Sequence, residues 1–326
     1  MTRLPDSTQP LSADAAAFAF DALLDGQCAA EDIARFLTDM SLRDETALEI
    51  AAAVRAMRAR MIRINAPDGA IDVCGTGGDG AHSLNISTAV ALVVAACEVP
   101  VAKHGNRAAS SKAGAADTLE ALGLNLDRAS AQAEASLKDL GICFLFAQKH
   151  HPALAPLAPI RKAIGRRTVF NLTGPLANPA GVTRQLIGVA RPDFLTVYAE
   201  AIAALDYEAV TLVSGDEPLD ELSVCGPSTC LTVGRPAERL APEDVGLTRH
   251  APEDLRGGDP AYNADALRRL LLGETGAYRD AVLLNAGAAL MVAGHAHDLR
   301  DGIEEAAEAL DRGLAKALLD CWIAYS

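Results

Sequence analysis

The chain has few aromatic side chains and no long apolar runs. Phe, Trp and Tyr make up only 4% of its 326 residues, although 50% of the residues are hydrophobic. A chain of this size can bury a sizeable core and would form one large domain or two modest ones. No apolar run is long and uniform enough to span a bilayer, and nothing near the N-terminus has the pattern of a signal peptide. We expect a protein without membrane contacts.

Basic residues and cysteine pairs are also scarce. The 29 Lys and Arg residues stand against 43 Asp and Glu residues, which gives a net charge of -14. Such an acidic field repels polyanions and makes nonspecific binding to nucleic acid unfavourable. The seven cysteines are odd in number and scattered, which is typical of a reduced cytoplasmic protein. Cys225 and Cys230 lack a second pair that would complete a zinc site, so ordinary packing is favoured for both.

Apolar periodicity predicts helices first and an α/β arrangement afterwards. Helices are expected over residues 13–24, 30–38 and 44–64, followed by a hinge at 67–69. Later strands are expected at 71–74, 99–102, 142–146, 185–189, 210–214, 229–233 and 281–284, and helices at 86–97, 115–121 and 129–140. Alternation of this kind implies a mostly parallel central sheet. The predicted fold class is α/β, with a small all-helical domain at 1–68 and a large α/β domain at 69–326.

Residues 72–117 contain two loops of the kind that bind phosphate. Gly75, Gly77 and Gly80 match the GxGxxG fingerprint of dinucleotide-binding folds. In those folds the second strand ends in an acidic residue that binds ribose hydroxyls. Here that strand is followed by Lys103 and His104, so the dinucleotide interpretation fails. Cations, hydroxyls and free backbone N–H groups in the second loop suit phosphate oxygens instead.

The helix expected between the two loops also favours an anion. Asn85 is a good N-cap, and Ser87 and Thr88 place hydroxyls in the first helical turn, where the helix dipole is positive. Taken singly, these features fit a tight turn, plain capping or a solvated charged surface equally well. Their convergence favours a ligand site, because loops at the carboxyl ends of parallel strands lie side by side.

A pair of carboxylates forms the second chemical feature. Asp220 and Glu221 follow the strand expected at 210–214, and adjacent carboxylates at a strand end can hold Mg²⁺. Asp216 and Glu217 are nearby competitors for that role. In an acidic chain such a pair is also common as solvated surface.

Ordered motifs give the chain a family resemblance. GTGGDG, NISTA, KHGNR, SS and LEALG are followed by FLFAQKHHPAL, APIRKAIGRRTVFNLTGPLANPA, QLIGVARP and LDELSVCGP. In this order and spacing they resemble the anthranilate phosphoribosyltransferases, which are the tryptophan-pathway members of the nucleoside-phosphorylase-like transferases. The resemblance covers nearly the whole chain. It implies Mg²⁺-dependent transfer of the phosphoribosyl group of 5-phosphoribosyl-1-pyrophosphate to anthranilate, a homodimer, and helices within about 151–180 that join the small domain.

The resemblance also implies site residues. Anthranilate would contact Gly75, Asn106 and Arg161, and Mg²⁺, with two ions expected per monomer, would be bound by Ser87, Asp220 and Glu221. The residues expected to bind phosphoribosyl pyrophosphate are Gly75, Gly78, Asp79, Ser83, Asn85, Ile86, Ser87, Thr88, Lys103, His104, Gly105, Asn106, Arg107, Ala108, Ala109, Ser110, Ser111 and Ala115.

Some of these assignments have alternatives. Ala115 stands where a serine is usual in the family, which leaves substrate affinity open. From the residues alone, Arg161 could be a solvated charge, and His104 could either donate to substrate or be satisfied within its loop. His150 and His151 lack metal-ligand spacing and are expected to be structural.

Two other functions stay open at this point. A pyrimidine nucleoside phosphorylase would share the fold, although the KHGNR loop and the region of Arg161 argue against it. A noncatalytic relative that binds nucleic acid should have a basic surface and degraded metal motifs. This chain is acidic and keeps Asp220 and Glu221.

Overall fold

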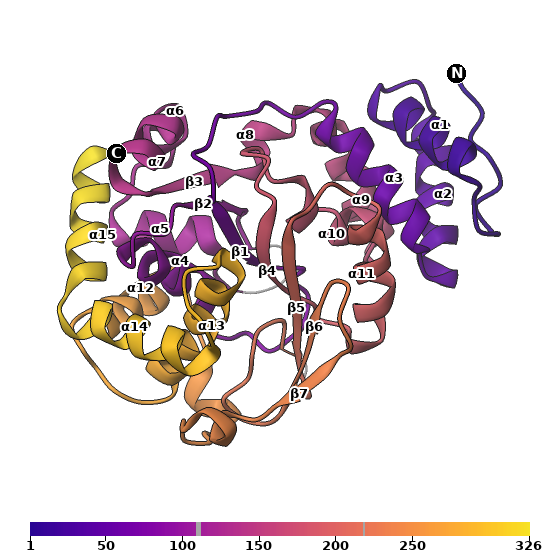
Figure 1. Ribbon diagram of the computed structural model, residues 1–326. Helices are drawn as coiled ribbons and strands as arrows, with labels where there is room; N and C mark the ends of the chain where they lie inside the picture. Colours follow the sequence, from indigo (N-terminus) through magenta and orange to yellow (C-terminus); the bar gives the residue numbers. More distant parts are fainter. Residues whose placement is uncertain (109–111, 218) are drawn as a thin grey trace.

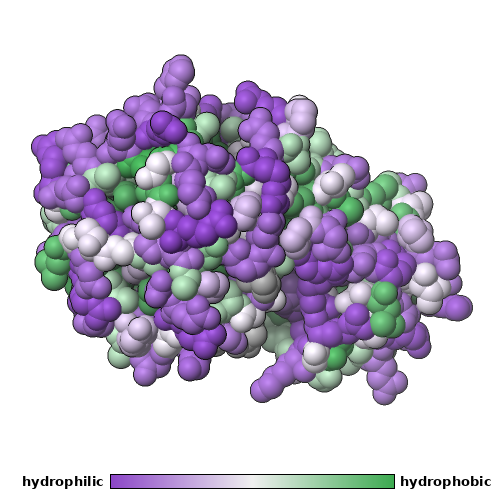
Figure 2. Space-filling model, turned by 90° about the horizontal axis from the view of Figure 1, so that it is seen from below, coloured by the Kyte–Doolittle hydropathy of each residue, from purple (hydrophilic) through white to green (hydrophobic). Residues whose placement is uncertain are grey.

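The computed structural model describes residues 1–108, 112–217 and 219–326 (Figure 1). Three helices open the chain: α1 (Ala13–Leu24), α2 (Ala30–Arg43) and α3 (Ala47–Arg58). They lie together at one side of the molecule, beside the α/β part. From below, the molecule shows a larger and a smaller lobe, both mainly hydrophilic with separate hydrophobic patches (Figure 2). Within the described ranges, no helix combines the length and apolar character needed to cross a membrane.

The bounds of α2 and α3 differ from the predicted ranges. The second helix continues to Arg43 and ends at Asp44, whose φ is 63°. The third helix begins after Thr46, which forms a capping box with Glu49. This box is encoded by Thr46, Ala47, Leu48 and Glu49, a start signal that the apolar periodicity alone did not use.

A seven-stranded sheet forms the centre of the α/β part, in the order β3-β2-β1-β4-β5-β6-β7. The strands are β1 (Ile71–Gly75), β2 (Val101–Gly105), β3 (Ile142–Phe146), β4 (Arg184–Gly188), β5 (Ala209–Gly215), β6 (Ser228–Thr232) and β7 (Glu238–Leu240). The first five are mutually parallel, and β6 and β7 are antiparallel to their neighbours. The predicted fold class, a helical domain plus a mostly parallel sheet, is confirmed.

One predicted strand is wrong. Residues 281–284 lie inside the helix α13 (Ala277–Ala293), and every residue from Ala281 to Leu290 is buried. A helix buried on all sides is apolar all round, so its short apolar runs resemble those of a buried strand. The single helix expected at 129–140 is divided into α6 (Leu126–Ala131) and α7 (Ala133–Leu140).

Helices cover both faces of the sheet, as parallel strands require. The core on one face is built with α4 (Ile86–Ala96) and α13, and it also contains residues of α5 (Ala115–Leu122), α12 (Pro260–Leu271), α14 (Leu299–Asp311) and α15 (Leu314–Tyr325). The core on the other face is built with α11 (Leu195–Ala203), and it continues through α3 and α10 (Val169–Leu172) to α1 and α2. Because side chains alternate along a strand, Leu186 belongs to the first core and Ile187 to the second.

The segment after β3 crosses to the helical domain. It contains α8 (Ala147–His150), α9 (Ala158–Ile164) and α10. Helix α9 contacts α2, and α10 contacts both α2 and α3. This segment therefore connects the sheet with the N-terminal helices.

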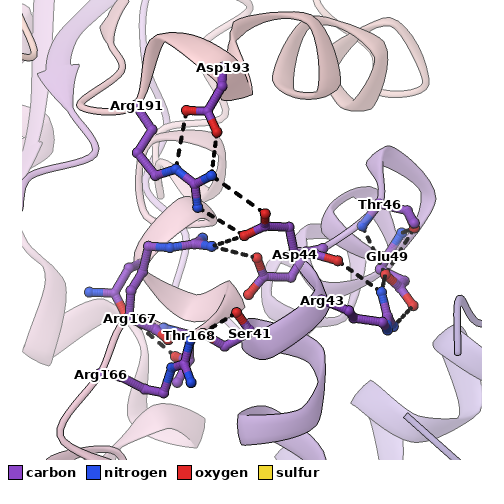
Figure 3. A network of polar contacts seen from close by, with 12 residues as sticks. Ser41, Arg43, Asp44, Thr46, Glu49, Arg166, Arg167, Thr168, Arg191 and Asp193 are labelled. Carbon is purple, nitrogen blue, oxygen red and sulfur yellow. Dashed lines mark hydrogen bonds and ion pairs between the residues drawn. The ribbon is translucent and has the colours of Figure 1, made fainter. Parts of the chain in front are cut away.

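A network of charged and polar side chains joins these parts (Figure 3). Asp44 and Glu45, in the turn between α2 and α3, both accept hydrogen bonds from Arg167, at 3.4 and 2.9 Å. Asp44 also pairs with Arg191 at 2.9 Å, at the start of the segment that leads to α11. The hydroxyl of Ser41 donates to the carbonyl of Arg167 at 2.6 Å. The α2–α3 turn is thus tied to two separate segments of the α/β part.

Glu49 is the most enclosed acid of this network, with a fully buried side chain. Its carboxylate accepts hydrogen bonds from Arg43 and from the backbone N–H groups of Leu11 and Thr46, both at 2.9 Å. Burial opposes ionisation, but the hydrogen bonds from Arg43, Thr46 and Leu11 outweigh it and lower the pKa of Glu49.

Replacing Glu49 by Gln should destabilise the protein by about 2 kcal/mol at neutral pH, because the hydrogen bonds to a charged acceptor are lost. The lowered folded-state pKa gives a stabilising contribution that is complete above the unfolded-state pKa of about 4.3 and is lost as the pH falls through the folded-state value. Urea denaturation of wild type and E49Q should therefore give a difference that shrinks in acid. The exposed Glu31 provides the control variant E31Q. A difference between wild type and E49Q that does not vary with pH would contradict this assignment.

Candidate active site

The loop that carries the two carboxylates rests on the ends of two neighbouring strands. β1 ends in Gly75 and β4 in Gly188, and a Cβ atom at either position would collide with Asp220. The Asp220 carboxylate accepts a hydrogen bond from the backbone N–H of Gly77 at 2.7 Å. The chain leaves β1 toward β2 on one side and returns to β4 on the other. Asp220 therefore lies at the switch point where open α/β sheets bind ligands.

Three carboxylates crowd at this point. The backbone N–H of Asp220 donates to Asp79 at 3.4 Å, so the glycine loop contributes an acid of its own. Burial, together with the charge of Asp79, raises the pKa of Asp220 to about 7. Burial and the charge of Asp220 raise the pKa of Glu221, although Lys103 and the backbone N–H of Ser87 oppose this shift. Carboxylates that repel one another in a half-buried site suit a hard cation.

Asp216 and Glu217, the nearby competitors for Mg²⁺ binding, have protein partners. Asp216 forms a salt bridge with the exposed Arg239, and Glu217 accepts a hydrogen bond from the hydroxyl of Ser223. Across the described ranges, no group of three or more His, Cys, Asp or Glu side chains could hold a metal ion alone. Oxygens that fit Mg²⁺ here are those of Asp220, Glu221 and Ser87, because Mg²⁺ uses few carboxylates and keeps water and phosphate ligands.

Lys103 and His104 belong to β2 itself, since the strand extends beyond its predicted end at 102 to Gly105. Side chains alternate along a strand, so the two face opposite sides of the sheet. Lys103 is buried on the side of α4, where its ammonium donates to the carbonyl of Val73 at 2.8 Å and to the hydroxyl of Ser87 at 3.2 Å. This places a cation beside the first turn of α4.

His104 faces the segment that follows β3. Its Nδ1 lies 3.1 Å from the carbonyl of Gly174, and its ring packs against His151 with centroids 5.1 Å apart. Burial and the neighbouring histidines lower the pKa of His104 to about 3 and that of His151 to about 4. The carbonyl of Gly174 requires a hydrogen on Nδ1, so the Nε2 atom is an acceptor. Within the described residues that buried Nε2 has no hydrogen-bond partner.

His150 and His151 have structural contacts, as expected. His150 Nδ1 lies 2.8 Å from the carbonyl of Ile62, and His151 packs on His104.

Asn85 occupies the N-cap position of α4, as predicted, but its side chain does not act as the cap. Its side chain makes no capping hydrogen bond to α4. Instead its Oδ1 atom accepts from Thr118 at 2.5 Å and from Asn263 at 2.9 Å, and its Nδ2 atom donates to the carbonyl of Ala113 at 3.4 Å. Asn85 thus joins the start of α4 to three later segments. Tertiary partners outcompete a local cap when the side chain is enclosed.

The rest of this first turn carries two hydroxyl groups, those of Ser87 and Thr88. Ile86 and Thr88 are buried and Ser87 is half-buried. The buried hydroxyl of Thr88 has no partner in the described ranges. In the preceding loop, Gly78 has a φ of 80° and Ser83 pairs with Arg256 in an isolated antiparallel bridge.

The second loop is folded back on α5. Arg107 forms salt bridges with Asp117 and Glu120 at 2.9 and 2.5 Å, so its guanidinium is already paired. The N–H of Ala108 donates to Asp117 at 2.9 Å. Asn106 is exposed and accepts from Gln148 of α8 at 3.4 Å. A side chain at Gly105 would collide with Phe144, because its Cβ would lie 2.8 Å from the ring. Ala115 is the first residue of α5. Ala109, Ser110 and Ser111 lie outside the described residues.

Arg161 lies in α9 and is half-buried. Its guanidinium stacks 5.7 Å from the ring of Phe170 and donates to Asn171 at 3.4 Å. Burial lowers its pKa, and in the described parts of the chain no carboxylate pairs with it. The guanidinium is therefore held in place without a counterion, although no hydrogen bond between described residues joins it to Gly75 or Asn106.

Several supporting residues were not predicted from the sequence. Buried Asp72 accepts from the N–H of His104 at 3.2 Å and from Asn178 at 2.8 Å. Asn263 contacts Asn85, and Asn285 contacts the backbone of Leu222. A polar residue inside an apolar run, as at Asp72 and Asn285, is the signal that could have found two of them.

Comparisons with known proteins agree with this geometry. The family described as glycosyl transferase family, a/b domain, matches residues 67–316, and the family described as glycosyl transferase family, helical bundle domain, matches residues 3–61. The anthranilate phosphoribosyltransferase of Novosphingobium aromaticivorans is 64% identical over 99% of each chain. That of Sphingopyxis alaskensis is 62% identical over 98% of each chain.

Solved structures give the same result. The crystal structure of anthranilate phosphoribosyltransferase from Thermus thermophilus superposes with a TM-score of 0.93 at 43% identity, covering 98% of this chain and 96% of the other. The Saccharomyces cerevisiae enzyme in complex with PRPP and Mg gives a TM-score of 0.90 at 28% identity, covering 99% and 95%. The chain belongs to the anthranilate phosphoribosyltransferase family.

Proposed function

We propose that the protein transfers the phosphoribosyl group of 5-phosphoribosyl-1-pyrophosphate to anthranilate, giving N-(5-phosphoribosyl)anthranilate and pyrophosphate in tryptophan biosynthesis. The observation that carries this proposal is the convergence of Asp79, Asp220 and Glu221 with Lys103 at the start of α4. An acidic cluster beside a buried cation and a helix N-terminus suits a metal-bound pyrophosphate. The relative from Saccharomyces cerevisiae binds PRPP and Mg, and also 4-fluoroanthranilate.

The pyrophosphate would lie between the glycine loop and the first turn of α4. Gly75, Gly78 and Asp79 line one side, and Ser87 and Thr88 offer hydroxyls on the other. Lys103 supplies positive charge to phosphate oxygens, and the loop 104–111 and Ala115 would complete the contacts. Asn85 and Arg107 would also contact the substrate, and their protein partners Thr118 and Asp117 would hold them at the site.

We propose two Mg²⁺ ions per monomer, bound by Ser87, Asp220 and Glu221 together with substrate oxygens. Bound Mg²⁺ would stabilise the negative charge that develops on the departing pyrophosphate. Burial and mutual repulsion raise the pKa values of Asp220 and Glu221, and a bound cation would favour their ionised forms. Lys103 donates to Ser87 and so holds that hydroxyl in place.

The acceptor would bind near Arg161 of α9, with its amine beside the ribose carbon. Arg161, unpaired within the described ranges and braced by Phe170, suits the carboxylate of anthranilate. Asn106 and Gly75 would bound the aromatic ring. The amine of anthranilate is neutral at pH 7, so alignment with the ribose carbon can supply much of the catalysis without a dedicated general base.

Domain division, assembly and location belong to the same proposal. Residues 1–68 and 69–326 would form the two domains, and the segment 151–180 would join the first of them. The contacts of α9 and α10 with α2 support this division.

A homodimer would form through the helical domain. A groove of about 260 Å³ between α1 and α3 is lined mainly by alanines, and the exposed Leu48 borders it. Seven free thiols support a cytoplasmic location.

The double variant Asp220→Asn, Glu221→Gln tests the reaction and the metal site together. Loss of both charges should reduce turnover at least about 100-fold, because the leaving-group charge is no longer stabilised. Loss of anthranilate fluorescence in the presence of phosphoribosyl pyrophosphate and Mg²⁺ measures the rate, and chelation of Mg²⁺ should abolish it.

The matched control is Asp216→Asn, Glu217→Gln, which removes the same charges from the same loop and should retain activity. Folded wild-type protein that gives no turnover would refute the proposed reaction. Phosphorolysis of thymidine or uridine, and then nucleic-acid binding, would be tested next.

Replacing Arg161 by Gln should raise the KM for anthranilate about 10- to 100-fold, because an ion pair with the substrate carboxylate is lost. The KM for phosphoribosyl pyrophosphate should not change. Lys162→Gln, at the exposed neighbouring position, is the control. Equal changes in both KM values would place Arg161 outside the acceptor site.

Replacing Leu48 by Asp should dissociate the dimer, because a charge would be buried against the partner's helical domain. The molar mass measured by light scattering should be twice the chain mass of 33.9 kDa for wild type and equal to the chain mass for L48D. Leu272→Asp, at another exposed apolar position just after α12, should leave the dimer intact. A wild-type protein that is monomeric at assay concentration would rule out this assembly.

A further inference from the structure

Asn285 is a fully buried polar residue in the middle of the apolar helix α13. Its side-chain Oδ1 accepts from the backbone N–H of Leu222 at 2.9 Å, and its Nδ2 donates to the carbonyl of Leu222 at 2.9 Å. Nδ2 also donates to the carbonyl of Ala281 in the preceding turn. The proposed reaction assigns no chemistry to this amide.

The contact holds the chain directly beside the carboxylate pair. Leu222 follows Glu221, and the amide of Asn285 engages both polar groups of that one residue. Two hydrogen bonds from one planar group fix orientation as well as position. On the N-terminal side of the pair, Asp220 is fixed because it lies against Gly75 and Gly188. The two carboxylates are therefore restrained from both sides.

The same helix also contacts the opposite side of the proposed metal site. Tyr278 lies two turns before Asn285 on the same face of α13. Its hydroxyl donates to the carbonyl of Asn85 at 3.1 Å, at the start of the helix that carries Ser87. One helix thus connects the Asp220–Glu221 loop to the first turn of α4.

The position of α13 is fixed by close packing on α14. A Cβ at Gly287 would lie 2.9 Å from the backbone nitrogen of Ile303, and a Cβ at Gly302 would lie 2.7 Å from the carbonyl oxygen of Gly287. The two backbones therefore approach through glycines. A helix held in this way can serve as a rigid support for a site.

We propose that Asn285 is a positioning residue, which orients Asp220 and Glu221 toward the cation and pyrophosphate through the backbone of Leu222. This inference rests on the proposed function, because it assigns Asn285 to the binding of Mg²⁺ with phosphoribosyl pyrophosphate. Outer residues that orient metal ligands typically change metal affinity about 10- to 100-fold when they are replaced.

The test compares Asn285→Ala with Leu290→Ala. Leu290 is fully buried in the same helix, so its truncation also destabilises the protein but leaves the Leu222 and Asn85 contacts in place. Calorimetric titration with Mg²⁺ and phosphoribosyl pyrophosphate, without anthranilate, measures binding. Hydrogen exchange over residues 219–226 measures how well the carboxylate loop is held.

N285A should bind Mg²⁺ and phosphoribosyl pyrophosphate about 10- to 100-fold more weakly and should exchange faster over 219–226. L290A should lower the melting temperature without changing either quantity. Tyr278→Phe, which removes one hydroxyl, should weaken binding less than N285A. Asn285→Ser, which keeps a hydroxyl in place, is the milder variant if N285A does not fold.

The outcomes separate the two proposals. If wild type binds and N285A or N285S binds equally tightly, Asn285 has no positioning role although the proposed function stands. Weakening in L290A equal to that in N285A would also reject the positioning role, since general destabilisation would explain both. Absence of binding by folded wild-type protein would refute the proposed function itself.

Discussion

The site depends on the close approach of Asp220 to two strand ends. Gly75 and Gly188 finish neighbouring parallel strands, and neither position has room for a Cβ because Asp220 fills that space. This contact brings a loop from beyond β5 to the crevice between β1 and β4. It also brings the carboxylate of Asp220 to the N–H of Gly77. The glycine loop and the acidic loop, 143 residues apart, therefore form one surface.

Alternation along β2 then divides the site into two sides. Lys103 and His104 are neighbours in sequence, but one faces α4 and the other faces Gly174 and His151. A cation is thereby placed beside Ser87 of α4, and a neutral imidazole is placed beside Gly174, in the segment that follows β3. Buried Asp72 accepts from the N–H of His104 and so fixes the strand at this point. Because a strand has a period of two, adjacent residues of one motif reach opposite faces of the sheet.

Sequence patterns predicted the parts of this molecule that depend on local chemistry. The order of the strands from β1 to β6, the glycine loop and the acidic pair follow from periodicity and from residue types that suit phosphate and Mg²⁺. The errors come from tertiary contacts. Residues 281–284 were expected to form a strand because an apolar run does not distinguish a buried helix from a buried strand. The side chain of Asn85 was expected to cap α4, yet it accepts hydrogen bonds from Thr118 and Asn263 instead. No local signal places residues 33 and 178 positions away beside Asn85.

The charges of the site run against the usual rule for a stable interior. Asp79, Asp220 and Glu221 repel one another, and burial raises the pKa values of Asp220 and Glu221. Such an arrangement destabilises the ligand-free protein, and it persists only where the surrounding structure holds the groups in place. That restraint comes from apolar packing behind the site, since α13 is buried through most of its length and meets α14 through paired glycines. Because a free loop would relieve the repulsion by moving apart, the proposed cation site depends on the support that this rigid helix gives to the carboxylate loop.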